Sequence, residues 1–155
     1  MKKYLNTILL LFFVLINSCG YAPLKSIKKT DFYIDNLKFE GDRKVSNYIT
    51  NNFIIYRDPT GKTKSYDLKI ISNYEKIIKN KDKNGNPKNY DLIISTQVII
   101  SSENEKDVTQ SFVRNISLTA KTNKITESEL EVKYKRNISD LISEDIIFFL
   151  INNTW

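Results

Sequence analysis

The stretch YDLIISTQVII covers residues 90–100. Along most of its length, mostly apolar residues alternate with residues that are more often polar. A period of two is the pattern of a β-strand with one buried face. One face of the predicted strand carries Tyr90, Leu92, Ile94, Thr96, Val98 and Ile100. We expect this strand to organise the fold, with the neighbouring segments arranged around it.

Two further strands are predicted, one on each side of this segment. Residues 66–78 alternate before it, and Asn84-Gly85, a dipeptide favoured in hairpin turns, lies between the two. A polar turn at residues 102–107 leads to renewed alternation over residues 108–118. The pattern therefore predicts a three-stranded meander with long arms.

A strand and a helix are predicted before the meander. Residues 32–39 form the strand, and their alternation slips near Asn36, as happens at a bulge or at a sheet edge. Asp42 is a good N-cap, and apolar residues after it recur at three- and four-residue spacing until near Arg57. This first strand can join the meander as a fourth strand.

A long helix is predicted at the end of the chain, over about residues 127–151 with Thr126 as its cap. Its apolar face is interrupted by three charged residues, Glu131, Lys135 and Asp145. The final turns, residues 146–151, are apolar nearly all round. Two explanations stay open for them: burial inside the domain, or additional cover by a partner.

The order strand, helix, three strands, helix predicts an α+β fold. We expect a two-layer sandwich with about four mainly antiparallel strands and both helices on one face. The other sheet face is then open and becomes a candidate contact surface. Its predicted members are Asp91, Ser95, Gln97 and Arg114, mixed with Ile93 and Ile99.

The N-terminus has the pattern of a bacterial lipoprotein signal peptide. Two lysines begin it, and the apolar run that follows, residues 8–16, is shorter than the roughly 20 residues that span a bilayer. Ser18, a small residue, precedes Cys19, the single cysteine of the chain. We expect residues 1–18 to be removed and Cys19 to carry diacylglycerol and an N-acyl chain. The alternative is an ordinary signal peptide followed by an incidental free cysteine.

The remainder divides into a flexible tether, residues 19–30, and a single domain, residues 31–155. A single cysteine excludes a disulfide within one chain, so the core must hold the domain alone. Loss of two signal-peptide lysines lowers the formal charge from +6 to about +4. A mild lysine excess suits an anionic head group, a membrane surface or nucleic acid, and the lipid anchor argues against nucleic acid.

Enzymatic activity is not expected from this composition. The chain has no histidine, and acylation would block its one thiol. Its four glycines form no phosphate-binding loop. Glu103 and Glu105 lie in a polar, turn-like stretch, as solvated charges rather than an acid–base pair. No metal and no cofactor beyond the covalent lipid are expected.

The segment CGYAPL, residues 19–24, combined with the order and spacing of the elements, resembles the LptE family of lipopolysaccharide-assembly lipoproteins in its alphaproteobacterial form. A basic, Asn-containing helix over residues 42–52 and a strand opened by YDL, residues 66–68, extend the resemblance. It covers essentially the whole chain after the signal.

The resemblance implies an outer-membrane lipoprotein that faces the periplasm, and Gly20 after the cysteine is compatible with that sorting. Such proteins plug LptD, the β-barrel lipopolysaccharide translocon, assist its assembly and help to deliver lipopolysaccharide to the outer leaflet. They act by binding and scaffolding. An envelope scaffold or barrel-assembly lipoprotein that binds only proteins is the alternative, and a periplasmic carrier for a small lipid is a third.

A lipopolysaccharide binder needs cations for phosphates beside apolar surface for acyl chains. Two groups of lysines meet the first requirement. They are Lys79, Lys81, Lys83 and Lys88 around the predicted hairpin turn, and Lys121 and Lys124 before the last helix. The alternative is that all six are ordinary solvated turn residues.

Overall fold

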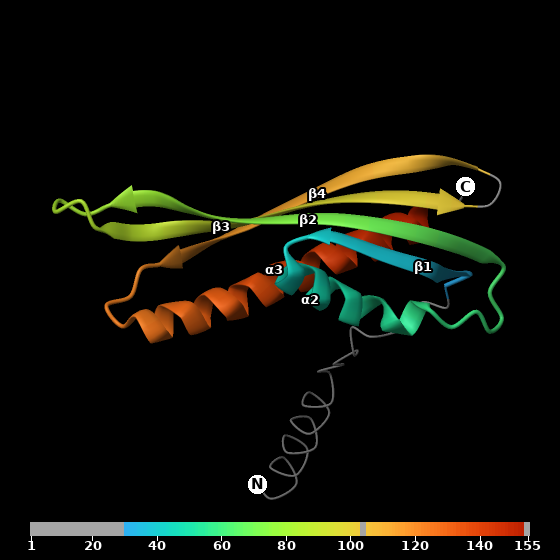
Figure 1. Cartoon of the computed structure of the whole chain (residues 1–155), viewed down its shortest axis with the longest axis horizontal. Helices are drawn as coiled ribbons and strands as arrows, with labels where there is room; N and C mark the ends of the chain where they lie inside the picture. Colours follow the sequence, from blue (N-terminus) through green and yellow to red (C-terminus); the bar gives the residue numbers. More distant parts are fainter. Residues whose placement is uncertain (1–29, 103–104, 154–155) are drawn as a thin grey trace, which may run out of the picture.

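The computed structural model describes residues 30–102 and 105–153. The signal peptide, Cys19 and nearly all of the predicted tether lie outside these residues. Four strands form one sheet, and two helices cover one of its faces (Figure 1). The predicted α+β class and element order are confirmed. The elements are β1 (Phe32–Gly41), α2 (Arg43–Phe53), the short 3₁₀ helix η1 (Ile54–Tyr56), β2 (Lys64–Lys81), β3 (Pro87–Ser102), β4 (Glu105–Thr119) and α3 (Lys124–Asn152).

The meander is the larger part of the sheet. β3, which contains residues 90–100, lies between β2 and β4 and pairs antiparallel with both. β2 continues to Lys81, beyond the predicted end at Ile78. The hairpin of β2 and β3 projects past the start of α3 (Figure 1). The long arms expected from the sequence are therefore present.

β1 extends the sheet by pairing in parallel with β2, and α2 forms the crossover between them. The register shifts between Ile34 and Leu37, which confirms the irregularity predicted near Asn36. Gly41 ends β1 with a positive φ of 95°, and a Cβ there would lie 1.9 Å from the Ser72 carbonyl oxygen. Only glycine fits so close to the neighbouring strand.

The helix starts follow from side-chain caps. The Asp42 carboxylate accepts hydrogen bonds from the Lys44 and Val45 amides at 2.9 Å, as its N-cap position predicted. The expectation that Thr126 caps the last helix is wrong. Asn123 does so, accepting from the Ile125 amide at 2.9 Å, and α3 therefore begins at Lys124.

The core lies between the sheet and the helices. Its fully buried members include Ile49 and Phe53 from α2, Leu92 and Ile94 from β3, and Ile142 from α3. The last turns of α3 are buried on one side only, because Ile146 and Leu150 are in the core whereas Phe148 is exposed. Whether a partner covers the exposed side stays an open prediction.

One member of the predicted open sheet face lies on the other face. Arg114 pairs directly with Ile94, and residues opposite each other on antiparallel strands share a face. Ile94 is buried under the helices, so Arg114 is on the helix side, where it forms a 2.7 Å ion pair with Asp145 of α3. Asp91, Ser95, Gln97, Ile93 and Ile99 alternate with the buried residues of β3 and lie on the open face as expected.

Candidate functional site

Both predicted lysine groups lie at the same end of the molecule, which we call the hairpin end. It consists of the β2–β3 hairpin, the end of β4 and the first turns of α3 (Figure 1). The Ala120 amide donates to the Lys88 carbonyl at 3.0 Å, which ties the segment carrying Lys121 to the start of β3. The fold therefore joins two groups that are more than 30 positions apart in the sequence.

Asp82 orders the turn of the hairpin. Its Oδ1 accepts hydrogen bonds from the amides of Asn84 at 2.8 Å and Asn86 at 2.9 Å. The bond from Asn86, with smaller contributions from other groups, lowers the pKa of Asp82. Gly85 provides the positive φ of 84° that the turn requires. The lysines beside this turn are thus carried on an ordered support.

Glu127 organises the connection between β4 and α3. The carboxylate, buried within the first turn of α3, accepts the Lys121 amide at 2.9 Å and forms an ion pair with Lys124 at 3.2 Å. The backbone bond is the main reason why the pKa of Glu127 is lowered. An acidic residue in the first turn also complements the helix dipole.

The six candidate lysines differ in their pairing. Lys79 lies 3.2 Å from Asp91, and Lys124 is paired with Glu127. The remaining four are exposed, and within residues 30–102 and 105–153 they form no ion pair: Lys81, Lys83, Lys88 and Lys121. Their charges are uncompensated, which suits an anionic ligand. The role of all six stays a prediction.

Sequence reasoning missed Lys76, which belongs to the same end. Its ammonium lies 2.8 Å from Glu131 and 3.4 Å from Glu127, and 4.2 Å from the centre of the Tyr90 ring. Burial acts to lower the pKa of Lys76, but the two carboxylates outweigh it and the pKa is raised. Lys76 thus fastens α3 to β2, and it is less available to a ligand than the unpaired lysines.

The charged residues that interrupt the apolar face of α3 all have partners in the sheet or in α2. Glu131 accepts from the Tyr74 hydroxyl at 2.8 Å. Lys135 lies 3.5 Å from the centre of the Tyr74 ring and 3.9 Å from the Asp42 carboxylate. Burial, followed by the bond to Glu131, raises the pKa of Tyr74. Charged side chains at core-facing positions need such partners. Their presence on the apolar face of the predicted helix was therefore the signal in the sequence that these contacts exist.

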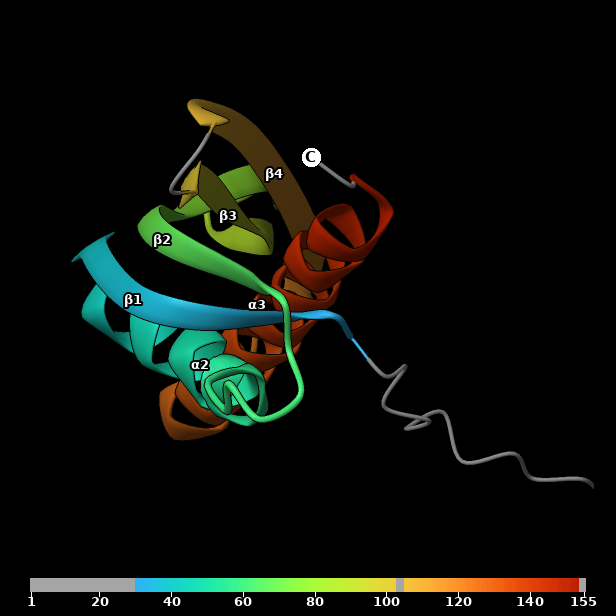
Figure 2. The ribbon, with the colours of Figure 1, turned by 90° about the vertical axis from the view of Figure 1, so that its right-hand side faces the viewer.

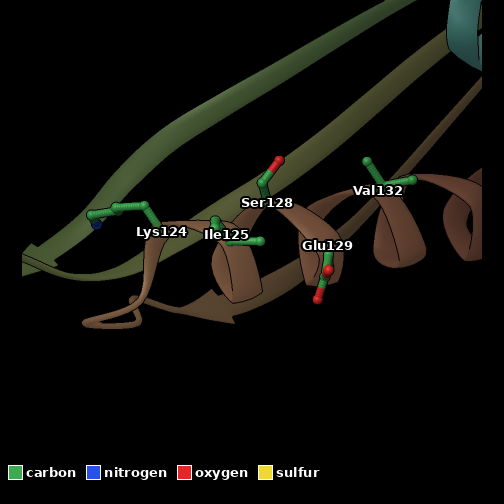
Figure 3. A pocket seen from close by; sticks show the side chains of 5 residues that line it. All are labelled: Lys124, Ile125, Ser128, Glu129 and Val132. Atoms are coloured by element: carbon green, nitrogen blue, oxygen red, sulfur yellow. The ribbon is translucent and has the colours of Figure 1, made fainter.

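An open hollow of about 560 Å³ lies along the first turns of α3. Its lining residues are Lys124, Ile125, Ser128, Glu129 and Val132 (Figure 3). Ile125 is 71% exposed and lies beside Lys124. An apolar side chain next to a cation is the combination that an anionic lipid requires, and the hollow belongs to the hairpin end.

The open sheet face is a second candidate surface. Asn73, Ser95 and Val113 pair across β2, β3 and β4 and so share this face. Val113 is 62% exposed, and Ile93 and Ile99 are partly exposed nearby on β3. The mixture of polar and apolar side chains suits contact with a protein surface.

Within the residues that the structure describes, no group of three or more acidic residues is placed to hold a metal ion. Over the same residues, no helix is both long and apolar enough to cross a membrane.

No family model matches the chain, and no curated protein matches it in sequence. Solved structures do resemble it in fold. Rare lipoprotein B from Shewanella oneidensis superposes with a TM-score of 0.55 at 11% identity, covering 76% of this chain and 97% of that one. The uncharacterized lipoprotein B from Nitrosomonas europaea gives 0.53 at 8% identity, covering 77% of this chain and 84% of that one.

A minor lipoprotein from Acinetobacter baumannii gives a TM-score of 0.51 at 12% identity and covers 72% of this chain and 87% of that one. Each of the three structures is matched over most of its length, so the likeness extends to the whole domain. The chain therefore shares the fold of these lipoproteins.

Proposed function

We propose that the chain is a lipid-anchored outer-membrane lipoprotein that faces the periplasm. It associates with the LptD-type β-barrel translocon as a plug, assists the assembly of that barrel, and helps to deliver lipopolysaccharide to the outer leaflet. The proposal rests mainly on one observation. The chain shares the fold of three lipoproteins, and its sequence also contains a lipoprotein signal pattern that ends at Cys19. The sequence resembles the LptE family of lipoproteins, and solved structures that share the fold of the chain are lipoproteins too.

The shape of the domain supports a plug. It is elongated, with the sheet on one side and the helices on the other (Figures 1 and 2). Polar or charged side chains are exposed on both layers, for example Gln97 on the sheet and Glu144 on α3. Such a body suits the polar lumen of a large barrel.

The hairpin end supports a contact with lipopolysaccharide. Four unpaired lysines there are available to phosphates, and exposed apolar residues lie among them, namely Ile77, Ile78 and Ile125. Lysine binds phosphate as a point charge and needs no rigid pocket. The function then consists of binding and scaffolding, without covalent chemistry.

A scaffold lipoprotein that binds only proteins is the second candidate. The open sheet face favours it, because Val113 and its neighbours provide apolar contact area away from the lysines. The two functions differ in their partners: a plug belongs to one large barrel, and a scaffold belongs to the barrel-assembly machinery.

Capture from detergent-solubilised membranes tests the proposal. The full chain with an affinity tag after Trp155 is purified from its own organism, and its stoichiometric partners are identified by mass spectrometry. Recovery of a single large translocon barrel supports the plug. Recovery of barrel-assembly subunits in its place rejects the plug and supports the scaffold.

A further inference from the structure

The end of the molecule opposite the lysines, which we call the chain-entry end, receives the chain from the predicted tether. Thr30 is buried there, and the Lys62 ammonium donates to its carbonyl and, at 3.0 Å, to its hydroxyl. The amides of Thr63 and Lys64 donate to the Asp31 carbonyl at 3.2 Å and 3.1 Å. The point at which the tether joins the domain is therefore fixed beside the loop that follows η1 (Figure 2).

Two adjacent isoleucines of η1 are exposed at this same end. Ile54 and Ile55 each leave 60% of their surface in solvent. The turn that carries them is firmly held, because Phe53 before it is fully buried and Tyr56 after it stacks on Phe32 with ring centres 5.8 Å apart. A rigid turn that presents two large apolar side chains to solvent costs free energy unless something covers them.

The length of the tether limits what can cover them. Thr30 lies eleven residues after Cys19, a reach of at most roughly 36–40 Å even when fully extended. A lipid on Cys19 therefore keeps the chain-entry end within that distance of the bilayer surface. The hairpin end is at the far end of the long axis (Figure 1).

The charge of the tether points to the same surface. It contains three lysines, Lys25, Lys28 and Lys29, and no acidic residue. Around η1 itself the charges are mixed, since exposed Arg57 is followed by Asp58, whose pKa is lowered by its hydrogen bonds to Thr60. An exposed apolar pair suits insertion into a bilayer, and a basic tether suits attraction to anionic head groups.

We infer that Ile54 and Ile55 form a membrane-docking surface that enters the leaflet holding the lipid of Cys19. The inference rests on the lipidation in the proposed function. Side chains of this kind lie about 5–10 Å into the boundary between head groups and acyl chains. The chain-entry end then lies at the bilayer surface, and the hairpin end lies at the other end of the long axis.

Tryptophan quenching by brominated lipid measures this contact. Trp155, the single tryptophan of the chain, is replaced by Phe, and one new tryptophan is introduced as Ile55→Trp. The matched control is Val113→Trp, at a similarly exposed position of the open sheet face. Each full-length, lipidated protein is reconstituted into vesicles of phosphatidylethanolamine and phosphatidylglycerol, with brominated or ordinary acyl chains, and circular dichroism checks its fold.

We expect the brominated chains to quench the new tryptophan of Ile55→Trp, with a blue shift of its emission, and to leave the emission of Val113→Trp unchanged. Equal emission of Ile55→Trp in both vesicles, in a protein that floats with them, overturns the inference while leaving the anchor intact. The same holds if both positions are quenched alike, since the domain then lies flat. Protein that does not float at all refutes the lipidation itself and the inference with it.

Discussion

The chain-entry end and the hairpin end belong to the same sheet but are held by different interactions. At the chain-entry end, Phe32 is 4% exposed and packs against the rings of Tyr56 and Tyr66. At the hairpin end, the contacts are mostly polar, as in the ion pair between Lys79 and Asp91. One end is built as a rigid attachment point, and the other presents charge on strands that extend beyond the core.

The difference suggests a division of labour along the long axis. Apolar burial is costly to disturb, whereas exposed ion pairs contribute little to stability. Substitutions at the chain-entry end should therefore act on anchoring and on stability. Substitutions at the hairpin end should act on ligand binding while the fold persists.

The largest expected effect comes from the anchor. Cys19→Ala removes the only thiol to which a lipid can be attached. We expect complete loss of acylation and release of the protein from membranes, measured by labelling with an acyl-chain probe and by membrane fractionation. Persistent labelling of this variant would contradict the assignment of the lipid to Cys19.

Charge reversal at the hairpin end should have the next largest effect. The test variant changes its four unpaired lysines, Lys81, Lys83, Lys88 and Lys121, to Glu. The matched control makes the same total change elsewhere, at Lys38, Arg43, Lys44 and Lys106. We expect binding to immobilised lipopolysaccharide to fall for the test variant only, with barrel association retained, because lysine clusters act through local charge.

Equal lipopolysaccharide binding by the two variants would show that these four lysines do not belong to the lipopolysaccharide-binding site. Reversal of the paired residues Lys79 and Lys124 provides a finer comparison. Their charges are already partly compensated by Asp91 and Glu127, so we expect a smaller loss of lipopolysaccharide binding per residue than for the unpaired four.

A stability comparison addresses the packing of the two ends. Phe32→Ala removes a buried ring and should lower the free energy of unfolding by about 3–5 kcal/mol. Tyr90→Ala removes a half-buried ring at the hairpin end, which Lys76 contacts, and should cost clearly less. Urea denaturation of both variants measures the difference, and equal losses would show that the ends are packed alike.

The smallest effect is a dependence of stability on pH through Glu127. Its folded-state pKa lies below the ordinary glutamate value of about 4.3, because the carboxylate accepts the Lys121 amide and faces two lysines. Its stabilisation is therefore present above that value and is lost as pH falls through the folded-state pKa.

Glu127→Gln should consequently reduce the free energy of unfolding near neutral pH and flatten its decline in acid. Denaturation curves recorded from neutral to acidic pH test this. If the free energy of unfolding of the variant falls as steeply in acid as that of the unmodified protein, other carboxylates cause the loss. Glu131, whose pKa is also lowered, is one of them.

Much of this architecture could be predicted from periodicity. Burial alternates so regularly through β3 that residues 90–100 alone identify a strand, and even the bulge near Asn36 is visible as a slipped pattern. Helix ends were less certain, because Asn123 and Thr126 both have suitable capping side chains. In the structure Asn123 caps α3, and Glu127 accepts the Lys121 amide, a contact that sequence spacing does not reveal.

Contacts between distant elements were not predictable. Arg114 was assigned to the open face because it is charged, although its place in the alternation of β4 matches that of Phe112. Only its pairing with Asp145, 31 positions away, explains a charge on the helix side. The meeting of Lys88 with the Lys121 segment likewise required the strand register.

Photo-crosslinking in living cells tests the central claim most directly. A photoreactive amino acid is placed on opposite faces of the domain, at Val113 on the open sheet face and at Leu141 on α3, both exposed. A plug is surrounded by its barrel, so both positions should crosslink to the same translocon barrel. Crosslinks from Val113 alone, or from both positions to barrel-assembly subunits, would contradict the plug.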